Sequence, residues 1–208
     1  MKLEELNKLK ELYLTKPDLP AFYYSLDGGG REILFDSIKK SKILVEIGSF
    51  VGGSTIQWCE INPKISIISV DSGFSGKWGW EYIKQNWNPA YTRGQKFEVP
   101  EGHTLLDYFL NNTFKYKDRI IPVDRNGIEF LHELIETGIR PCMFYIDASK
   151  DLPELEIISD LFPEATISGD DWTWGSNEHR KNFQKKIYNH ANKLGKQVLH
   201  DRATWIIK

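Results

Sequence analysis

Short runs of consecutive apolar residues alternate along this chain with segments of helical spacing. The runs are rich in β-branched residues and lie at 42–48, 65–71, 119–123, 142–147 and 165–170. Such runs are typical of strands that are buried on both faces of a sheet. Helical spacing is found at 54–61, from about His103, at 127–138 and at 152–162. The pattern predicts an α/β protein in which strands and helices alternate.

The two ends of the chain depart from this alternation. Residues 196–208 (KQVLHDRATWIIK) contain two strand-like runs joined by a tight turn, which can pair only antiparallel. Residues 1–41 contain helical stretches around a loop that is rich in proline, glycine and aromatic residues. We therefore expect an N-terminal helical arm and flap over 1–41. A doubly wound, mostly parallel sheet over 42–208 should follow, with helices on both faces and an antiparallel C-terminal hairpin.

A long connection at 72–102 separates the second predicted strand from the next helix. It is far longer than an ordinary strand-to-helix loop. Five large aromatic residues argue against disorder: Trp78, Trp80, Tyr82, Trp87 and Tyr91. Two interpretations stay open, a helical insertion that adds to the core and a lid or wall for a substrate.

Composition narrows the class of partner. The formal net charge of -2 and the pI near 6.2 do not favour nucleic acid or an anionic membrane surface. The N-terminus is charged, without the apolar segment of a signal peptide, and no run is long enough to span a bilayer. Cys59 and Cys142 lie in apolar segments and are expected to be buried and unpaired. We expect a cytoplasmic protein.

The turn after the first predicted strand, VEIGSFVGGST (45–55), is rich in glycine and contains an acid. Glycine allows a ligand to approach the backbone at the carboxyl end of a strand, although glycine also serves packing in tight turns. The order differs from the G-x-G-x-x-G of dinucleotide sites, and Glu46 would repel a phosphate. Glu46 suits an amine or a sulfonium instead. Asp71, at the end of the second strand, is placed to accept hydrogen bonds from ribose hydroxyls.

A cluster of acids is predicted where the fourth and fifth strands end. Asp147 ends one strand, and Asp170 and Asp171 end the next, so the three carboxylates should converge. Like charges this close disfavour ionisation unless a cation neutralises them, and hard oxygen ligands select Mg²⁺ or Ca²⁺. The alternatives are that Asp147 and Asp171 cap helices and that Lys150 is a solvated charge.

These residues resemble the class I S-adenosylmethionine-dependent methyltransferases over about residues 42–208. VEIGSFVGGST is similar to the first motif of that family and ISVD to the second, and the terminal hairpin is similar to the end of its seven-stranded, Rossmann-like sheet. The resemblance implies S-adenosylmethionine as cofactor and an adenine-contacting loop at 123–127. The residues it implies around the cofactor are Glu46, Gly48, Ser49, Phe50, Gly52, Gly53, Ser54, Asp71, Asp124, Arg125, Asn126 and Asp147.

The acid cluster is similar to that of the catechol O-methyltransferase group and of bacterial sugar and natural-product methyltransferases. That resemblance implies Mg²⁺ on Asp147, Asp170 and Asp171. It also implies catalysis by Asp147 together with Lys150, which would take the proton of the acceptor hydroxyl. Two departures are evident. The bacterial enzymes have histidine where this chain has Lys150, and the catechol enzyme has Asp-Asn in place of Asp170-Asp171.

The expected function is therefore divalent-metal-assisted O-methylation of a small-molecule hydroxyl on a sugar, phenol or natural product. Metal-independent N-methylation and a cofactor-binding protein without catalysis stay open as alternatives. His103 and His179 are the other candidates for the base. The expected partner is a small-molecule acceptor, without nucleic acid or membrane, and a homodimer through the aromatic insertion or the N-terminal arm stays open.

Overall fold

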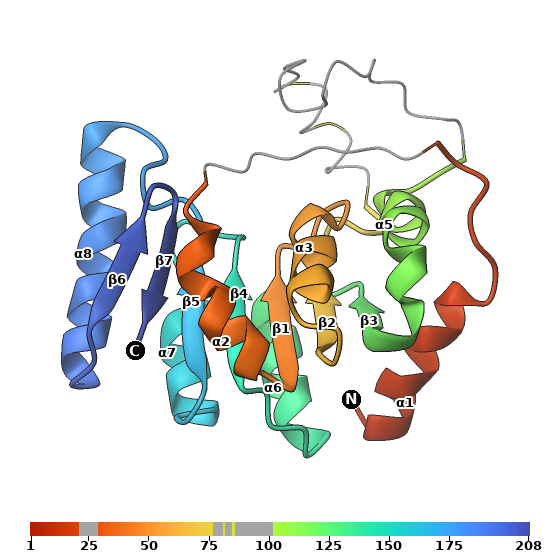
Figure 1. The fold of residues 1–208 in the computed structure, drawn as a ribbon, viewed down its shortest axis with the longest axis horizontal. Helices are drawn as coiled ribbons and strands as arrows, with labels where there is room; N and C mark the ends of the chain where they lie inside the picture. The colour runs from red at the N-terminus through yellow and green to blue at the C-terminus, as the bar shows by residue number, and fades with distance from the viewer. Residues whose placement is uncertain (21–28, 77–80, 82–84, 86–101) are drawn as a thin grey trace.

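The computed structural model describes residues 1–20, 29–76, 81, 85 and 102–208. Seven strands form one sheet in the order β3-β2-β1-β4-β5-β7-β6 (Figure 1). Neighbouring strands from β1 to β5 run parallel, and β7 is antiparallel to both β5 and β6. The strands are β1 (Ile43–Ile47), β2 (Ser66–Val70), β3 (Ile120–Val123), β4 (Met143–Ile146), β5 (Thr166–Gly169), β6 (Val198–Asp201) and β7 (Thr204–Ile207). The predicted doubly wound sheet with an antiparallel hairpin is confirmed.

Helices cover both faces of this sheet (Figure 1). One face carries α2 (Phe35–Lys40), α3 (Gly53–Ile61) and α5 (Leu105–Thr113), and the other carries α6 (Gly127–Glu136), α7 (Glu154–Leu161) and α8 (Asn177–Lys193). Short helical segments complete the described chain: α1 (Leu3–Lys8), η1 (Leu9–Tyr13), η2 (Arg31–Leu34) and η4 (Phe114–Arg119). Right-handed crossovers between parallel strands account for this two-sided covering.

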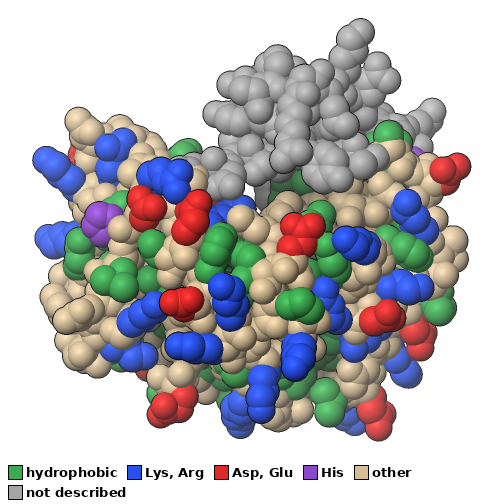
Figure 2. Space-filling view, viewed as in Figure 1, with side chains coloured by type: hydrophobic (Ala, Val, Ile, Leu, Met, Phe, Trp, Pro, Cys, Tyr) green, Lys and Arg blue, Asp and Glu red, His purple; other side chains and the backbone are tan. Residues whose placement is uncertain are grey.

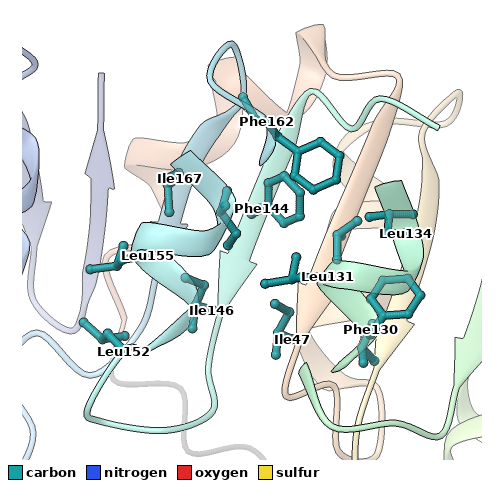
Figure 3. Packing of buried hydrophobic residues seen from close by; sticks show 14 of the residues in the cluster. Ile47, Phe130, Leu131, Leu134, Phe144, Ile146, Leu152, Leu155, Phe162 and Ile167 are labelled. Carbon is teal, nitrogen blue, oxygen red and sulfur yellow. The ribbon is translucent and has the colours of Figure 1, made fainter. Parts of the chain in front are cut away.

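Each face of the sheet has its own hydrophobic core. Beneath α6 and α7, Ile47 and Ile146 of the central strands meet Phe130 and Leu131 (Figure 3). The opposite core contains the fully buried side chain of Trp58. Successive side chains of a strand point to opposite faces, so neighbouring residues of β1 enter different cores. The two cores hold the strands rigid and fix where their carboxyl ends meet.

The N-terminal segment reaches the far edge of the sheet. The Gly29 carbonyl accepts hydrogen bonds from the backbone N–H of Ala203 (3.2 Å) and the Thr204 hydroxyl (3.1 Å). This contact places η2 beside the hairpin of β6 and β7. The boundary expected at residue 41, the flap aromatics and the five aromatic residues of the insertion stay predictions, because the flap and those aromatics lie outside the described residues.

Two further expectations concern the cysteines and the membrane. Cys59 is buried, as expected, but Cys142 is exposed because it precedes β4 instead of lying within it. Both thiols are free. Among the described residues, no helix is long and apolar enough to cross a bilayer. The cytoplasmic location stays a prediction.

Candidate active site

A pocket of about 480 Å³ lies at the carboxyl ends of the parallel strands. The loops after β1, β2, β3, β4 and β5 all contribute to its wall, as expected for the ligand crevice of an open α/β sheet. Of the predicted site residues, the following line it: Gly48, Ser49, Phe50, Gly53, Ser54, Asp71, Arg125, Asn126, Asp147, Lys150, Asp170 and Asp171. Glu46, Gly52 and Asp124 do not.

Two glycines of the loop after β1 are required by packing within the protein. Gly48 has φ 94°, and a Cβ on it would lie 2.0 Å from the Asp147 carbonyl oxygen. Gly52 has φ 84°, and a Cβ there would lie 2.6 Å from the Thr113 side chain. Gly53, by contrast, has open space where its Cβ would be and faces the pocket. The packing interpretation therefore holds for two glycines, and ligand approach fits the third.

The Asp71 side chain links the glycine loop to the end of β2 by hydrogen bonds. Its Oδ2 accepts a hydrogen bond from the Phe50 backbone N–H at 2.8 Å, and its Oδ1 accepts one from the Gly73 N–H at 2.7 Å. Burial raises the pKa of the Asp71 carboxyl, while these two bonds act to lower it. A carboxylate has about four acceptor positions, so Asp71 can accept further bonds from a ligand in the pocket.

Glu46 points away from the pocket, into the core under α3. Its carboxyl accepts hydrogen bonds from the Thr55 hydroxyl and from Trp58 Nε1 (3.1 Å), and no part of the side chain is exposed. Burial raises its pKa. Glu46 therefore does not line the pocket, where the resemblance had placed it, because this position of β1 faces α3. Glu46 instead anchors the helix that follows the glycine loop.

The loop after β3 offers less than the resemblance implied. The Arg125 side chain is half exposed, and its Nε lies 3.8 Å from a Glu133 carboxylate oxygen. Asn126 Oδ1 accepts a hydrogen bond from the Ile128 N–H at 2.9 Å and so caps α6. Asp124 lies beyond the pocket wall.

The three predicted acids do meet at one side of the pocket. Lys150 Nζ contacts Asp171 and lies 3.6 Å from Asp147 Oδ1, so the ammonium is shared by the ends of β4 and β5. The helix-cap alternatives are wrong, because α7 begins after Pro153 and α8 is capped by Ser176. Asp171 has φ 69°, a left-handed conformation that aspartate tolerates better than most residues and that turns the loop back toward the pocket.

Arg31 is a pocket residue that the sequence did not reveal. It comes from η2, is 7 % exposed, and its guanidinium lies 3.4 Å from Asp170 Oδ2. The same guanidinium stacks over the rings of Trp58 and Tyr145 at 5.6 and 5.9 Å. Three carboxylates therefore face two side-chain cations, Lys150 and Arg31. The formal charge at this side of the pocket is one negative unit.

This pairing changes the expected roles of the metal and the lysine. Within the described part of the chain, no three histidine, cysteine or acidic side chains surround a common point that could hold a metal ion. The carboxylates face Lys150 and Arg31, so as arranged they do not fit the expected Mg²⁺ site. The neighbouring carboxylates also raise the pKa of Lys150, although its burial acts to lower it. Lys150 is therefore a cation at neutral pH and, as such, cannot take the proton of the acceptor hydroxyl.

Asp147 is the member of this pair that titrates near neutral pH. Burial raises its pKa to about 7, against the opposing effect of Lys150 and with the support of the negative charges on Asp171 and Asp170. Its side chain remains about a third exposed toward the pocket. The carboxyl group of Asp147 can therefore gain and lose a proton near neutral pH.

Two more lining residues escaped the sequence analysis. Trp174 is 54 % exposed at the pocket, with Lys150 Nζ 5.9 Å from its ring, and Glu154 is almost fully buried in the first turn of α7. A glutamate at a helix start is common for reasons of the helix dipole, so Glu154 carried no special signal. His103 and His179 do not line the pocket.

The fold and the pocket define the class: the chain has the fold of class I S-adenosylmethionine-dependent methyltransferases. The O-methyltransferase of Bacillus cereus, solved in complex with S-adenosylhomocysteine, is 16% identical, with a TM-score of 0.53 over 99% of this chain and 88% of that one. The Streptomyces achromogenes O-methyltransferase involved in tomaymycin synthesis, in complex with S-adenosylmethionine, is 14% identical, with a TM-score of 0.52 over 99% and 88%. The S-adenosylhomocysteine-bound Podospora anserina methyltransferase is 17% identical, with a TM-score of 0.53 over 98% and 86%. No protein-family model and no curated protein matches the sequence.

Proposed function

We propose that this protein transfers the methyl group of S-adenosylmethionine to a hydroxyl oxygen of a small molecule. The observation that carries the proposal is one continuous pocket that joins the glycine loop and Asp71 to the pair of Asp147 and Lys150. Two solved structures with this fold, one in complex with S-adenosylhomocysteine and one with S-adenosylmethionine, are O-methyltransferases. The fold supports the cofactor, and the acid–lysine pair supports the chemistry.

The cofactor would lie across the carboxyl ends of β1 and β2. Asp71 would accept hydrogen bonds from the ribose hydroxyls with its remaining lone pairs, and the backbone at Ser49 and Gly53 would border the methionine part. A sulfonium is a cation, so the formal negative charge of the acid cluster would stabilise it in the pocket.

The transfer step needs alignment and removal of one proton. The acceptor oxygen attacks the methyl carbon, the bond between that carbon and sulfur breaks, and the sulfonium becomes a neutral thioether. The hydroxyl proton passes to the Asp147 carboxylate, which lies at the pocket and has a pKa near 7. Lys150 stays an ammonium and holds Asp147 and Asp171 in place. No step is assigned to Mg²⁺.

The acceptor is proposed to be a small ring-bearing molecule. Trp174 lines the pocket and is half exposed, and an indole face can stack on a phenol or on a sugar ring. Figure 2 shows both basic and acidic side chains on one face of the protein, with Lys and Arg more frequent over its lower part. The formal net charge of -2 favours a small molecule over a nucleic acid as the acceptor.

N-methylation is the second candidate, and one observation favours it. The carboxylates outnumber the cations around the pocket, and this balance would also attract a protonated amine acceptor. An amine must lose its proton before it attacks, so both reactions use Asp147. Matched alcohol and amine acceptors, assayed with the same enzyme, distinguish the two.

The proposal is tested by calorimetry with S-adenosylhomocysteine and by methyl transfer to a panel of hydroxyl-bearing acceptors. We expect the wild type to bind the ligand. Asp147→Asn should bind it within about 3-fold of the wild type but lose at least about 100-fold in turnover, as general-base variants do. Asp71→Ala should instead weaken binding. Absence of binding by the wild type, or full turnover by Asp147→Asn, would refute the proposal.

A further inference from the structure

One buried acid at the pocket has no part in the proposed transfer step. Glu154 is 4 % exposed and lines the pocket from the first turn of α7. Its Oε2 is buried and has no hydrogen-bond partner among the described residues. A buried acceptor without a partner is costly, and native proteins rarely keep one that no ligand or water satisfies.

The position of Glu154 relates it to the far end of the pocket. Its Oε1 is 3.5 Å from the point that a Cβ on Gly127 would occupy, so the carboxyl lies against the loop after β3. The Asp71 N–H donates to the Val123 carbonyl at the end of β3 (3.0 Å), and Asp71, Asn126, Gly127 and Glu154 all line the same pocket. A nucleoside whose ribose is held at Asp71 would therefore extend its base toward Glu154.

Two other side chains at this end of the pocket have contacts within the protein. Asn126 Oδ1 caps α6, and Arg125 extends to Glu133 at the surface. Asp124 is outside the pocket. Glu154 is left as the buried carboxyl that can accept a hydrogen bond from a base.

We infer that Glu154 recognises the adenine of the cofactor by accepting a hydrogen bond from the N6 amine of adenine. This inference rests on the proposed function. The amine is a donor and matches the unpartnered carboxyl oxygen, and rotation about the last side-chain torsion can present either oxygen. A base that carries a carbonyl at this position would place an acceptor against an acceptor. Glu154 is thus a specificity residue for adenine, outside the loop that the sequence had suggested.

Calorimetry with S-adenosylhomocysteine and S-inosylhomocysteine tests this inference, because the two ligands differ at that amine. The wild type should prefer the adenosyl ligand by at least about 10-fold. With the inosyl analogue, which lacks the N6 amine, the Glu154 carboxyl is left without its donor. Glu154→Leu should reduce the preference to within about 3-fold, mainly by weakening adenosyl binding. Glu154→Gln should keep adenosyl binding and narrow the preference, because an amide can present its carbonyl or, after a flip, its NH₂ group.

Glu156→Leu is the matched control, since Glu156 lies on the same helix and its exposed side chain pairs with Lys193 at 3.2 Å. This variant should keep the wild-type preference. The ratio of the two affinities is independent of the amount of folded protein. If Glu154→Leu does not fold, the ratio measured with Glu154→Gln tests the inference. An unchanged preference in the folded Glu154 variants overturns this inference alone, whereas a wild type that binds neither ligand overturns the proposed function as well.

Discussion

Removal of the Lys150 ammonium should make Asp147 a weaker acid. Lys150 Nζ lies 3.6 Å from Asp147 Oδ1, and at this distance two unit charges interact by about 1.2 kcal/mol at the dielectric constant of water. Both side chains are about a third exposed, so the value for water is the appropriate lower bound. Since 1.36 kcal/mol corresponds to one pKa unit, Lys150→Met should raise the pKa of Asp147 from about 7 to about 8.

Carboxyl carbon-13 NMR measures this change without knowledge of the acceptor. Asp147→Asn assigns the resonance, and Lys186→Met is the control, because Lys186 pairs with Asp151 at the surface (2.8 Å) and does not line the pocket. In the control the Asp147 titration should stay where it is in the wild type. A titration in Lys150→Met that is unmoved or shifted to lower pH would refute the assignment of Lys150 as the cation that holds Asp147.

Three further outcomes are expected. His190 is buried and hydrogen-bonded to the Ser159 hydroxyl at 2.7 Å, and burial lowers its pKa, so this site gains a proton first in the unfolded chain as pH falls below about 6.5. In thermal melts, the stability of the wild type relative to His190→Gln should therefore fall from pH 7 to 5. Gly48→Ala should destabilise the fold by more than about 2 kcal/mol in urea unfolding, because its Cβ meets the Asp147 carbonyl at positive φ, and a wild-type midpoint would contradict the packing argument. Dialysis against EDTA should leave turnover unchanged, because Lys150 and Arg31 already pair with the acids, and a loss that Mg²⁺ restores would argue for a metal.

The architecture was accessible from the sequence because its signals are local. Each buried parallel strand is one apolar run, and the carboxyl ends of parallel strands share one edge of the sheet. The convergence of Asp147 with Asp170 and Asp171 followed from this rule alone. The position of the balancing cation could not be predicted in this way. Arg31 precedes Asp170 by 139 residues and reaches it through the contact of η2 with the hairpin.

The sequence also does not predict the direction in which a side chain points when its strand is covered on both faces. Glu46 lies in the glycine motif, but alternation alone does not tell which face of β1 it enters when both faces are apolar. The tertiary structure turns it toward α3, where Thr55 and Trp58 bind it. The need for glycine at position 48 is likewise set by a strand that follows about a hundred residues later, so sequence spacing suggested a ligand where the protein itself is the neighbour.

The docking of η2 on the β6–β7 turn has a consequence for synthesis of the protein. Arg31 is translated long before Ala203 and Thr204, which donate hydrogen bonds to the carbonyl of Gly29. A nascent polypeptide in which β6 and β7 have not yet emerged can pair β1 with β2, but it lacks the contact that docks η2. A complete pocket can therefore form only once β6 and β7 are available, and removal of the hairpin takes away the contact that holds η2, and with it Arg31, beside Asp170.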